Sequence, residues 1–275
     1  MLMFAADWRI VMGAMVLTLG GCGAKPAVET SATRQPAATV VVLVAASAQE
    51  AVGELAGSFK AETGVEVRVV ADDSAKLAQQ IVNGAPADLF LSASPKWTNH
   101  LDEKGLLARR TPLLGNRLVL VVPAGNPADI SGPADLLTPR VKHLALAGPN
   151  VPAGMNARQA LGKLGLLEKL DQQHKIVSGE NVRVTLAYAE RAEVEAAIVY
   201  STDARVSNKI ETVFVFPDSL HDAIVYPLAV VKPTSGSDPA AAAIRLYDYL
   251  QQPPAAEVFR RRGFQWLGSQ SNAGK

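Results

Sequence analysis

Short apolar runs alternate with segments whose apolar residues repeat at helical spacing, and this alternation constrains the fold more than any other feature. Strand-like runs rich in apolar residues lie at 40–44, 65–70, 87–91, 118–122, 144–146 and 196–200. Helical spacing is found at 52–59 (with Gly64 as its stop), 77–81, 153–164, 182–191, 240–250 and 254–262. Strands that alternate with helices at this spacing predict βαβ units. We therefore expect an α/β protein with mainly parallel sheets that carry helices on both faces.

The N-terminus has the pattern of an export signal. Arg9 precedes an apolar run at 10–19, which is shorter than the roughly 20 residues that a membrane-spanning helix needs. The run ends in Leu-Gly-Gly-Cys at 19–22, which resembles the lipobox of bacterial lipoproteins. That resemblance implies a signal peptide at 1–21, a lipidated Cys22, and a flexible tether at 22–38. The alternative is an incidental cysteine after an ordinary signal peptide. We expect a periplasmic or cell-envelope protein anchored to the membrane through Cys22.

Composition argues against several classes of function. The chain has 27 Lys and Arg against 26 Asp and Glu, a formal net charge of +1, so no nucleic-acid partner is expected. Cys22 is the single cysteine, which excludes an intrachain disulfide and a Cys-rich metal site. The sequence contains no Gly-rich phosphate loop, HExxH motif or Gly-x-Ser-x-Gly elbow, and its four histidines are scattered. We therefore expect no enzyme and no bound metal ion. A structural lipoprotein is disfavoured because aromatic residues make up only 5% and no repeat is evident.

Small hydrogen-bond donors stand at five points where an apolar strand gives way to a helix. A helix start presents unpaired backbone N–H groups and the positive end of the helix dipole, so it favours an anion. Several such starts around one cleft would hold an anion without Lys or Arg. Either serine taken alone is equally typical of a simple helix cap. The five stretches are Ala45-Ala46-Ser47, Asp73-Ser74-Ala75, 150–154, Asn181-Val182-Arg183 and Val199-Tyr200-Ser201.

From about residue 39 to 263 the chain carries, in order, a set of short motifs. They are VAAS at 44–47, LAQQI at 77–81, GAPADLF at 84–90, LLGN at 113–116, VPAG at 151–154, IVY at 198–200 with Asp203-Ala204, YPLAVV at 226–231, YDYL at 247–250 and RGF at 262–264. This series resembles the periplasmic molybdate-binding proteins of ABC importers. The resemblance implies a two-lobe periplasmic-binding-protein fold of type II. One lobe would comprise 39–121 plus 227–268, the other 122–226, with crossings near Leu120 and Val225 and a tail at 269–275.

The resemblance also implies a ligand and the residues that bind it. The ligand would be molybdate or tungstate, held between the lobes and delivered to the membrane permease of an ABC transporter by a monomeric receptor with no other cofactor. Molybdate is a dianion with four acceptor oxygens and no proton, so an ideal site offers only donors. A binding protein for phosphate or sulfate is the alternative; an enzyme or a structural lipoprotein of this fold is more remote. The implied donors are the hydroxyls of Ser47 and Ser74, the backbone N–H groups of Ala153 and Val182, and the hydroxyl of Tyr200.

Three charged residues beside these donors leave questions open. Many relatives have small or hydroxyl residues before the second serine, whereas this chain has Asp72 and Asp73. A carboxylate facing the anion would repel a bare dianion but would accept a proton from hydrogen phosphate. Alternatively, both aspartates cap or precede the helix and face solvent. Arg183 is either a direct counter-ion or a residue of the helix surface.

Overall fold

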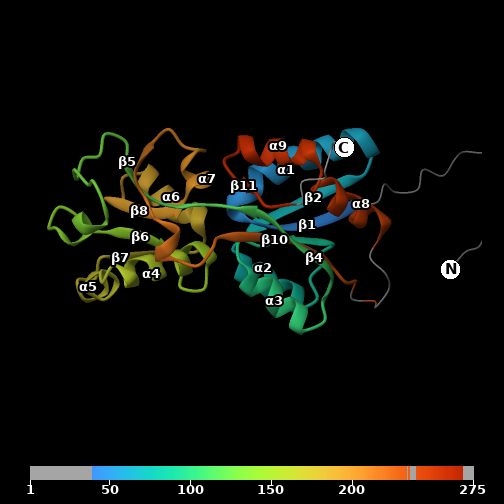
Figure 1. Ribbon diagram of the computed structural model, residues 1–275, viewed down its shortest axis with the longest axis horizontal. Helices are drawn as coiled ribbons and strands as arrows, with labels where there is room; N and C mark the ends of the chain where they lie inside the picture. Colours follow the sequence, from blue (N-terminus) through green and yellow to red (C-terminus); the bar gives the residue numbers. More distant parts are fainter. Residues whose placement is uncertain (1–38, 234, 236–239, 269–275) are drawn as a thin grey trace, which may run out of the picture. The chain divides into compact units, whose positions relative to one another are not determined.

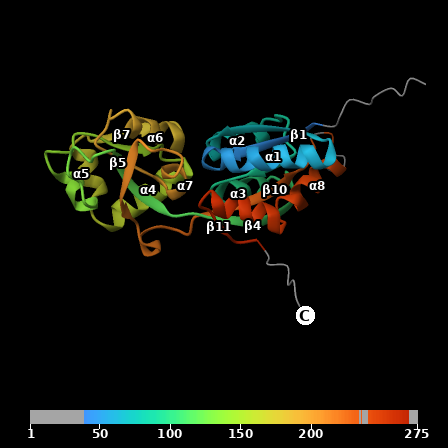
Figure 2. The ribbon, with the colours of Figure 1, turned by 90° about the horizontal axis from the view of Figure 1, so that it is seen from above.

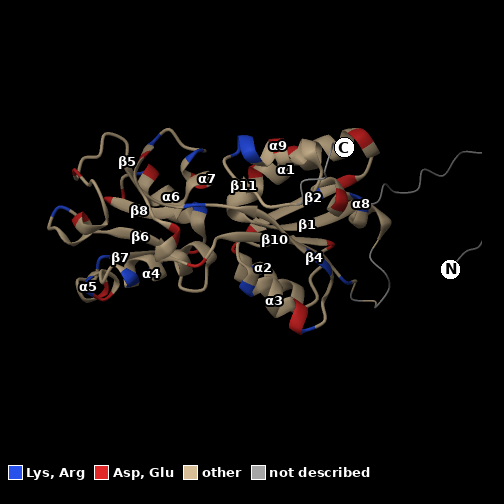
Figure 3. Cartoon of the chain, in the orientation of Figure 1, with Lys and Arg blue, Asp and Glu red and all other residues tan. Residues whose placement is uncertain are grey.

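A computed structural model describes residues 39–233, 235 and 240–268 of the 275-residue chain. The predicted signal peptide at 1–21, the tether at 22–38 with Cys22, and the tail at 269–275 lie outside the described residues. Among the residues that are described, no helix is long and apolar enough to cross a membrane. Acidic and basic positions are interspersed over the helices and loops (Figure 3), as the small net charge leads one to expect.

The first of two sheets has six strands and is built around a buried parallel core. β1 pairs in parallel with both β2 and β3, whereas β10 runs antiparallel to β3 and β4, and β11 antiparallel to β4. The strand order is β11 (Gln265–Trp266), β4 (Leu107–Gly115), β10 (Val225–Val231), β3 (Leu89–Leu91), β1 (Thr39–Ala45) and β2 (Glu66–Asp72).

Helices cover both faces of this sheet (Figure 1). The chain passes from β1 through α1 to β2 and returns through α2 to β3 on the other side of β1. Because such crossovers are right-handed, α1 and α2 lie on opposite faces. Gly64 ends α1 in the left-handed conformation, with φ at 71° and its N–H bonded to Lys60. The helices are α1 (Gln49–Thr63, after the 3-10 turn η1, Ala46–Ala48), α2 (Ser74–Val82), α3 (Pro95–Glu103), α8 (Ala241–Tyr249) and α9 (Pro253–Arg261).

The second sheet repeats this plan with five strands. β6 pairs in parallel with β7 and β8, and β5 runs antiparallel to β8 and β9. The strand order is β7 (Ile176–Gly179), β6 (Leu144–Ala147), β8 (Ala196–Tyr200), β5 (Leu118–Pro123) and β9 (Ile210–Val215). The chain crosses from β6 to β7 through α4 and returns to β8 through α6, so these two helices again cover opposite faces. The helical segments are η2 (Pro133–Leu137), α4 (Pro152–Lys163), α5 (Leu167–Gln172), α6 (Val182–Glu190), α7 (Ser201–Ala204) and η3 (Asp218–Leu220).

Two connections join the sheets, green and orange in Figures 1 and 2. The chain leaves the first sheet after Gly115 and enters the second at Leu118, then returns between Val215 and Val225. The expected division after residue 121 falls inside β5, which belongs wholly to the second sheet.

The α/β fold is confirmed, and each sheet joins a parallel core to antiparallel strands. The reason is topological: β5 and β10 enter their sheets directly from the connections, without a crossover helix, and run antiparallel to their neighbours. Sequence analysis did not predict β4 or β9. Each carries a polar, largely exposed stretch (109–110 in β4 and 211–212 in β9) that interrupts its apolar pattern.

Candidate functional site

The carboxyl ends of six strands, three from each sheet, border one small cavity. They are the ends of the two parallel triplets, β1–β3 and β6–β8, and in open α/β sheets ligands bind beyond such ends. The space between the lining atoms, including the part open to solvent, is about 220 Å³. All five predicted donor residues border it, together with eight others. The lining is Ala45, Ala46, Ser47, Asp72, Asp73, Ser74, Ala93, Val151, Pro152, Ala153, Asn181, Val182 and Tyr200.

Two glycines allow the second sheet to present its helix starts here. A Cβ at Gly154 would lie 2.2 Å from the carbonyl oxygens of Ala147 and Gly148, so only glycine lets the first turn of α4 pack so closely on the end of β6. A Cβ at Gly179 would lie 2.4 Å from Oγ1 of Thr185. Close approach of the backbone is therefore what brings the starts of α4 and α6 to the cavity.

In three helices the side-chain caps do not take up every backbone donor of the first turn. In α6 the Asn181 side chain accepts from the N–H groups of Arg183 and Val184, which leaves that of Val182. In α2 the Asp73 side chain accepts from Ala75 and Lys76, which leaves that of Ser74. In α4 residue 152 is proline and position 151 makes no side-chain cap, which leaves the N–H groups of Ala153 and Gly154. These free donors and the three helix dipoles favour a negative charge.

The hydroxyl of Ser47 is oriented by a chain of side-chain hydrogen bonds. Asn116 Nδ2 donates to Tyr226 Oη over 3.1 Å, and Tyr226 Oη lies 2.8 Å from Ser47 Oγ. The amide orientation of Asn116 is fixed because its Oδ1 accepts from the backbone N–H of Arg117 at 2.9 Å. Since Tyr226 accepts from Asn116, its own proton can be donated to Ser47. The proton of Ser47 is then free for a ligand in the cavity.

Ser74 is oriented in a similar way by the backbone. Its Oγ accepts the N–H of Ala93 at 3.0 Å, and the residue is only 1% exposed. A serine hydroxyl that already accepts a backbone hydrogen bond has its single proton left to donate. Both serines, one after β1 and one after β2, thus border the cavity with hydroxyls held by hydrogen bonds.

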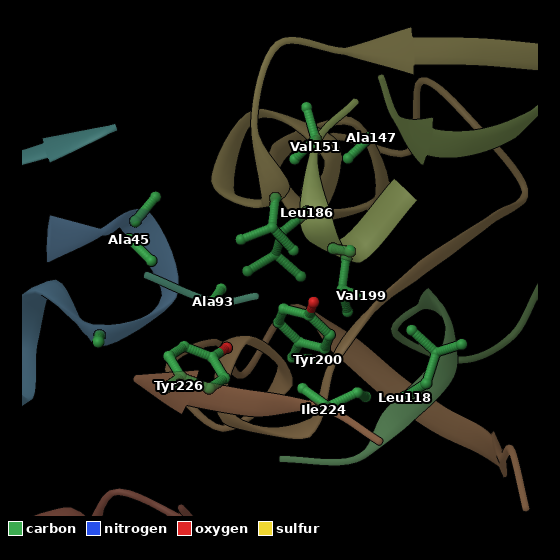
Figure 4. Packing of buried hydrophobic residues seen from close by; sticks show 14 of the residues in the cluster. Ala45, Ala93, Leu118, Ala147, Val151, Leu186, Val199, Tyr200, Ile224 and Tyr226 are labelled. Carbon is green, nitrogen blue, oxygen red and sulfur yellow. The ribbon is translucent and has the colours of Figure 1, made fainter. Parts of the chain in front are cut away.

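Tyr200 reaches the cavity from the end of β8. Its Oη donates to Asn156 Oδ1 at 3.1 Å, so a bond to a ligand would require the hydroxyl to turn from Asn156. Burial raises the pKa of Tyr200 well above its usual value, and the hydroxyl therefore keeps its proton. In Figure 4 its ring lies beside that of Tyr226.

The two aspartates play different parts. Asp73 is the N-cap of α2, as one alternative held, but it is 4% exposed and borders the cavity instead of facing solvent. Asp72 is partly exposed, and its Oδ1 accepts from the backbone N–H of Asp73 and from Asn181 Nδ2. The expectation that both face solvent is therefore wrong for Asp73.

Arg183 is not among the residues that border the cavity. Its guanidinium donates to Glu50 of α1 at 2.5 Å and forms an ion pair with Asp203 of α7, in which Nε lies 2.9 Å from Oδ1. Burial raises the pKa of Asp203 to about 7, although the charge of Arg183 acts to lower it. The arginine therefore links the elements of the two sheets beside the cavity instead of serving as a direct counter-ion.

Sequence reasoning missed the residues that support the donors: Ala93, Asn116, Asn156, Glu50 and Tyr226. Asn116 and Tyr226 lie in motifs that the sequence analysis quoted, but their roles depend on partners more than 100 residues away. Across the described ranges, no group of three or more His, Cys, Asp or Glu residues is arranged to hold a metal ion.

Comparison with known proteins agrees with this arrangement. The model of the bacterial extracellular solute-binding protein family matches residues 40–265. The chain belongs to this family.

Two relatives and one solved structure extend the similarity. The chain is 40% identical over 232 residues to the molybdate-binding protein ModA of Escherichia coli strain K12, covering 82% of this chain and 88% of that protein. It is 35% identical over 252 residues to YvgL of Bacillus subtilis strain 168, a putative ABC transporter substrate-binding lipoprotein, covering 90% and 93% of the two chains. The Azotobacter vinelandii periplasmic molybdate-binding protein superposes with a TM-score of 0.72 at 24% identity, covering 82% and 98%. Membership of the solute-binding family thus rests on sequence and fold together.

Proposed function

We propose that this protein captures molybdate or tungstate and delivers it to the permease of an ABC importer. The observation that carries the proposal is the cavity at six strand ends, which neither Lys nor Arg borders. Its donors are two oriented serine hydroxyls, the free N–H groups of Ala153 and Val182, and the Tyr200 hydroxyl. Fixed neutral donors suit a small tetrahedral dianion, because each of its four oxygens needs a donor in a site that excludes water. The relatives named for molybdate support the same ligand.

The proposed lobes are the groups of elements around the two sheets, with the anion held between them. Ser47 and Ser74 come from the first group, and Ala153, Val182 and Tyr200 from the second. Because neither group supplies the whole donor set, the closed arrangement should bind the anion better than an open one. Three bonds support closure: Arg183 to Glu50, Asn181 to Asp72 and Lys76 to Glu180.

We also propose that the mature protein is a monomeric lipoprotein without catalytic activity, anchored through Cys22 on the outer side of the cell membrane. The relative described as a substrate-binding lipoprotein supports the anchor. Mass spectrometry of the membrane-extracted protein should find a lipid on Cys22. Release of a Cys22→Ala variant into the soluble fraction would confirm the assignment, and an unmodified cysteine would contradict it.

Calorimetric titration with molybdate, tungstate, sulfate and phosphate tests the ligand. We expect molybdate and tungstate to bind more tightly than the smaller sulfate and phosphate ions. Distance measurements between labels on α3 and α5 should show compaction when molybdate is added. Binding without any change in distance would remove the closure step but leave the ligand assignment intact.

A second candidate is hydrogen phosphate, and Asp73 is the observation that favours it. The Oδ2 atom of Asp73 is buried and has no hydrogen-bond partner among the described residues, so it can accept the proton of a protonated oxyanion. Tighter binding of phosphate than of molybdate in the same titration would establish this alternative.

A further inference from the structure

One carboxyl oxygen of Asp73 accepts hydrogen bonds, and the other has no partner among the described residues. Oδ1 accepts the backbone N–H groups of Ala75 and Lys76, both at 3.0 Å, and so caps α2. Oδ2 is buried and makes no hydrogen bond with any described residue. Asp73 is among the residues that border the cavity, and it is 4% exposed. A buried polar atom without a partner is costly, so the free oxygen indicates a bond that forms only with a ligand.

No charged group around Asp73 forms an ion pair with its Oδ2 atom among the described residues. On β2, the neighbouring carboxylate of Asp72 repels a charge on Asp73. On α2, Lys76 attracts it but forms ion pairs with Asp72 at 3.8 Å and with Glu180, which precedes α6, at 3.1 Å. From the end of β8, Tyr200 presents a neutral hydroxyl. Burial, the largest effect, raises the pKa of Asp73 above its usual value.

A dianion in the cavity strengthens this tendency. Two like charges in one buried site disfavour the charged form of the group that can take up a proton. Molybdate is fully deprotonated at neutral pH and brings no proton of its own. The carboxyl group therefore has to obtain its proton from solvent, and a protonated carboxyl then offers an O–H donor where a carboxylate offers only acceptors.

We propose that Asp73 couples anion capture to the uptake of one proton. In the occupied site Oδ2 carries this proton and donates it to an oxygen of the anion, while Oδ1 still caps α2. The step starts from a molybdate dianion, the Asp73 carboxylate and one proton from solvent. It ends with a neutral Asp73 carboxyl group beside the bound dianion, so charge and protons balance. This inference rests on the proposed oxyanion-binding function and identifies a residue that determines its pH response.

The pH response follows from the two protonation states. Below the pKa of Asp73 in the empty site the proton is already present, and molybdate affinity is constant. Between that pKa and the higher one of the occupied site, affinity falls by up to tenfold for each unit of pH because each binding event takes up a proton. An asparagine at this position keeps an oxygen for the cap and a permanent N–H donor, without a titratable proton.

The test is calorimetric titration of sodium molybdate at a series of pH values in two buffers with different ionisation enthalpies. In the wild-type protein the apparent binding enthalpy should differ between the buffers by an amount that corresponds to up to one proton taken up. In Asp73→Asn and Asp73→Ser, both of which retain a helix cap, the buffer difference should vanish and affinity should be independent of pH. Asp102→Asn, which removes a half-exposed carboxylate of α3 that pairs with Arg110, should behave like the wild type.

Any other result of these titrations decides against the role of Asp73 or against the proposed function. Molybdate binding without proton uptake in the wild type would overturn the role of Asp73 but leave the proposed function standing. Proton uptake that persists in both Asp73 variants would assign the proton to another group and also overturn it. If circular dichroism shows that the variants do not fold, the two-buffer measurement on the wild type still tests the proposal, because absence of proton uptake overturns it. Absence of molybdate binding at every pH would refute the proposed function itself.

Discussion

Replacing Ser74 by alanine should weaken both anion binding and the fold. The variant removes a hydroxyl donor to a charged oxygen, which contributes about 1.5–3 kcal/mol, so affinity should fall by roughly tenfold to 150-fold. It also removes the acceptor of the Ala93 N–H, a 3.0 Å bond in a fully buried region. An unsatisfied buried N–H costs about 1–3 kcal/mol, and about 2–4 °C of melting temperature is lost per kcal/mol in a domain of this size.

Two assays separate these effects, with Ser92→Ala as the matched control. Ser92 is also fully buried and accepts a backbone N–H, that of Ser94, but it does not border the cavity. Calorimetry should show lost affinity only for Ser74→Ala, whereas thermal unfolding should show lost stability for both variants. Wild-type affinity in Ser74→Ala would refute the reasoning, because the hydroxyl would then serve only Ala93.

Three further changes test the supporting residues. Tyr226→Phe removes the hydroxyl that orients Ser47. Calorimetry should show molybdate affinity lower by about two- to tenfold, equivalent to about 0.5–1.5 kcal/mol. A loss of affinity larger than that of Ser47→Ala would contradict this role. Glu50→Gln removes the charged partner of Arg183 beside the cavity. Because the pair is partly exposed, we expect only about 0.5–1 kcal/mol, or two- to fivefold weaker binding, with a smaller effect of added salt than in the wild type. The raised pKa of Asp203, about 7 against 3.8 for the free side chain, means that the folded state holds its proton more tightly than the unfolded state. The free energy of unfolding should therefore fall as pH rises from about 4 to about 7, and chemical denaturation of Asp203→Asn should show a flatter profile.

Sequence analysis predicted the parts of this protein that neighbouring residues control. The apolar runs became the buried strands β1, β5, β6 and β8, and Gly64 ends α1 as expected. Asn181 and Asp73 cap the helices that follow them. Such features depend on side chains within a few positions of the backbone groups that they satisfy, so a single sequence contains the necessary information.

Only the tertiary structure decided which of these local features meet. β5 and β10 run antiparallel because of the connections between the sheets, and no local pattern specifies that direction. Ser47 is oriented by Tyr226, 179 residues along the chain, and Asp73 is buried by segments that arrive from both sheets. The sequence by itself determined where strands end and helices begin, because those boundaries are set by local hydrogen bonding and apolar spacing. The folded chain alone determined that six strand ends share one cavity, because that depends on crossovers and sheet pairing over long separations.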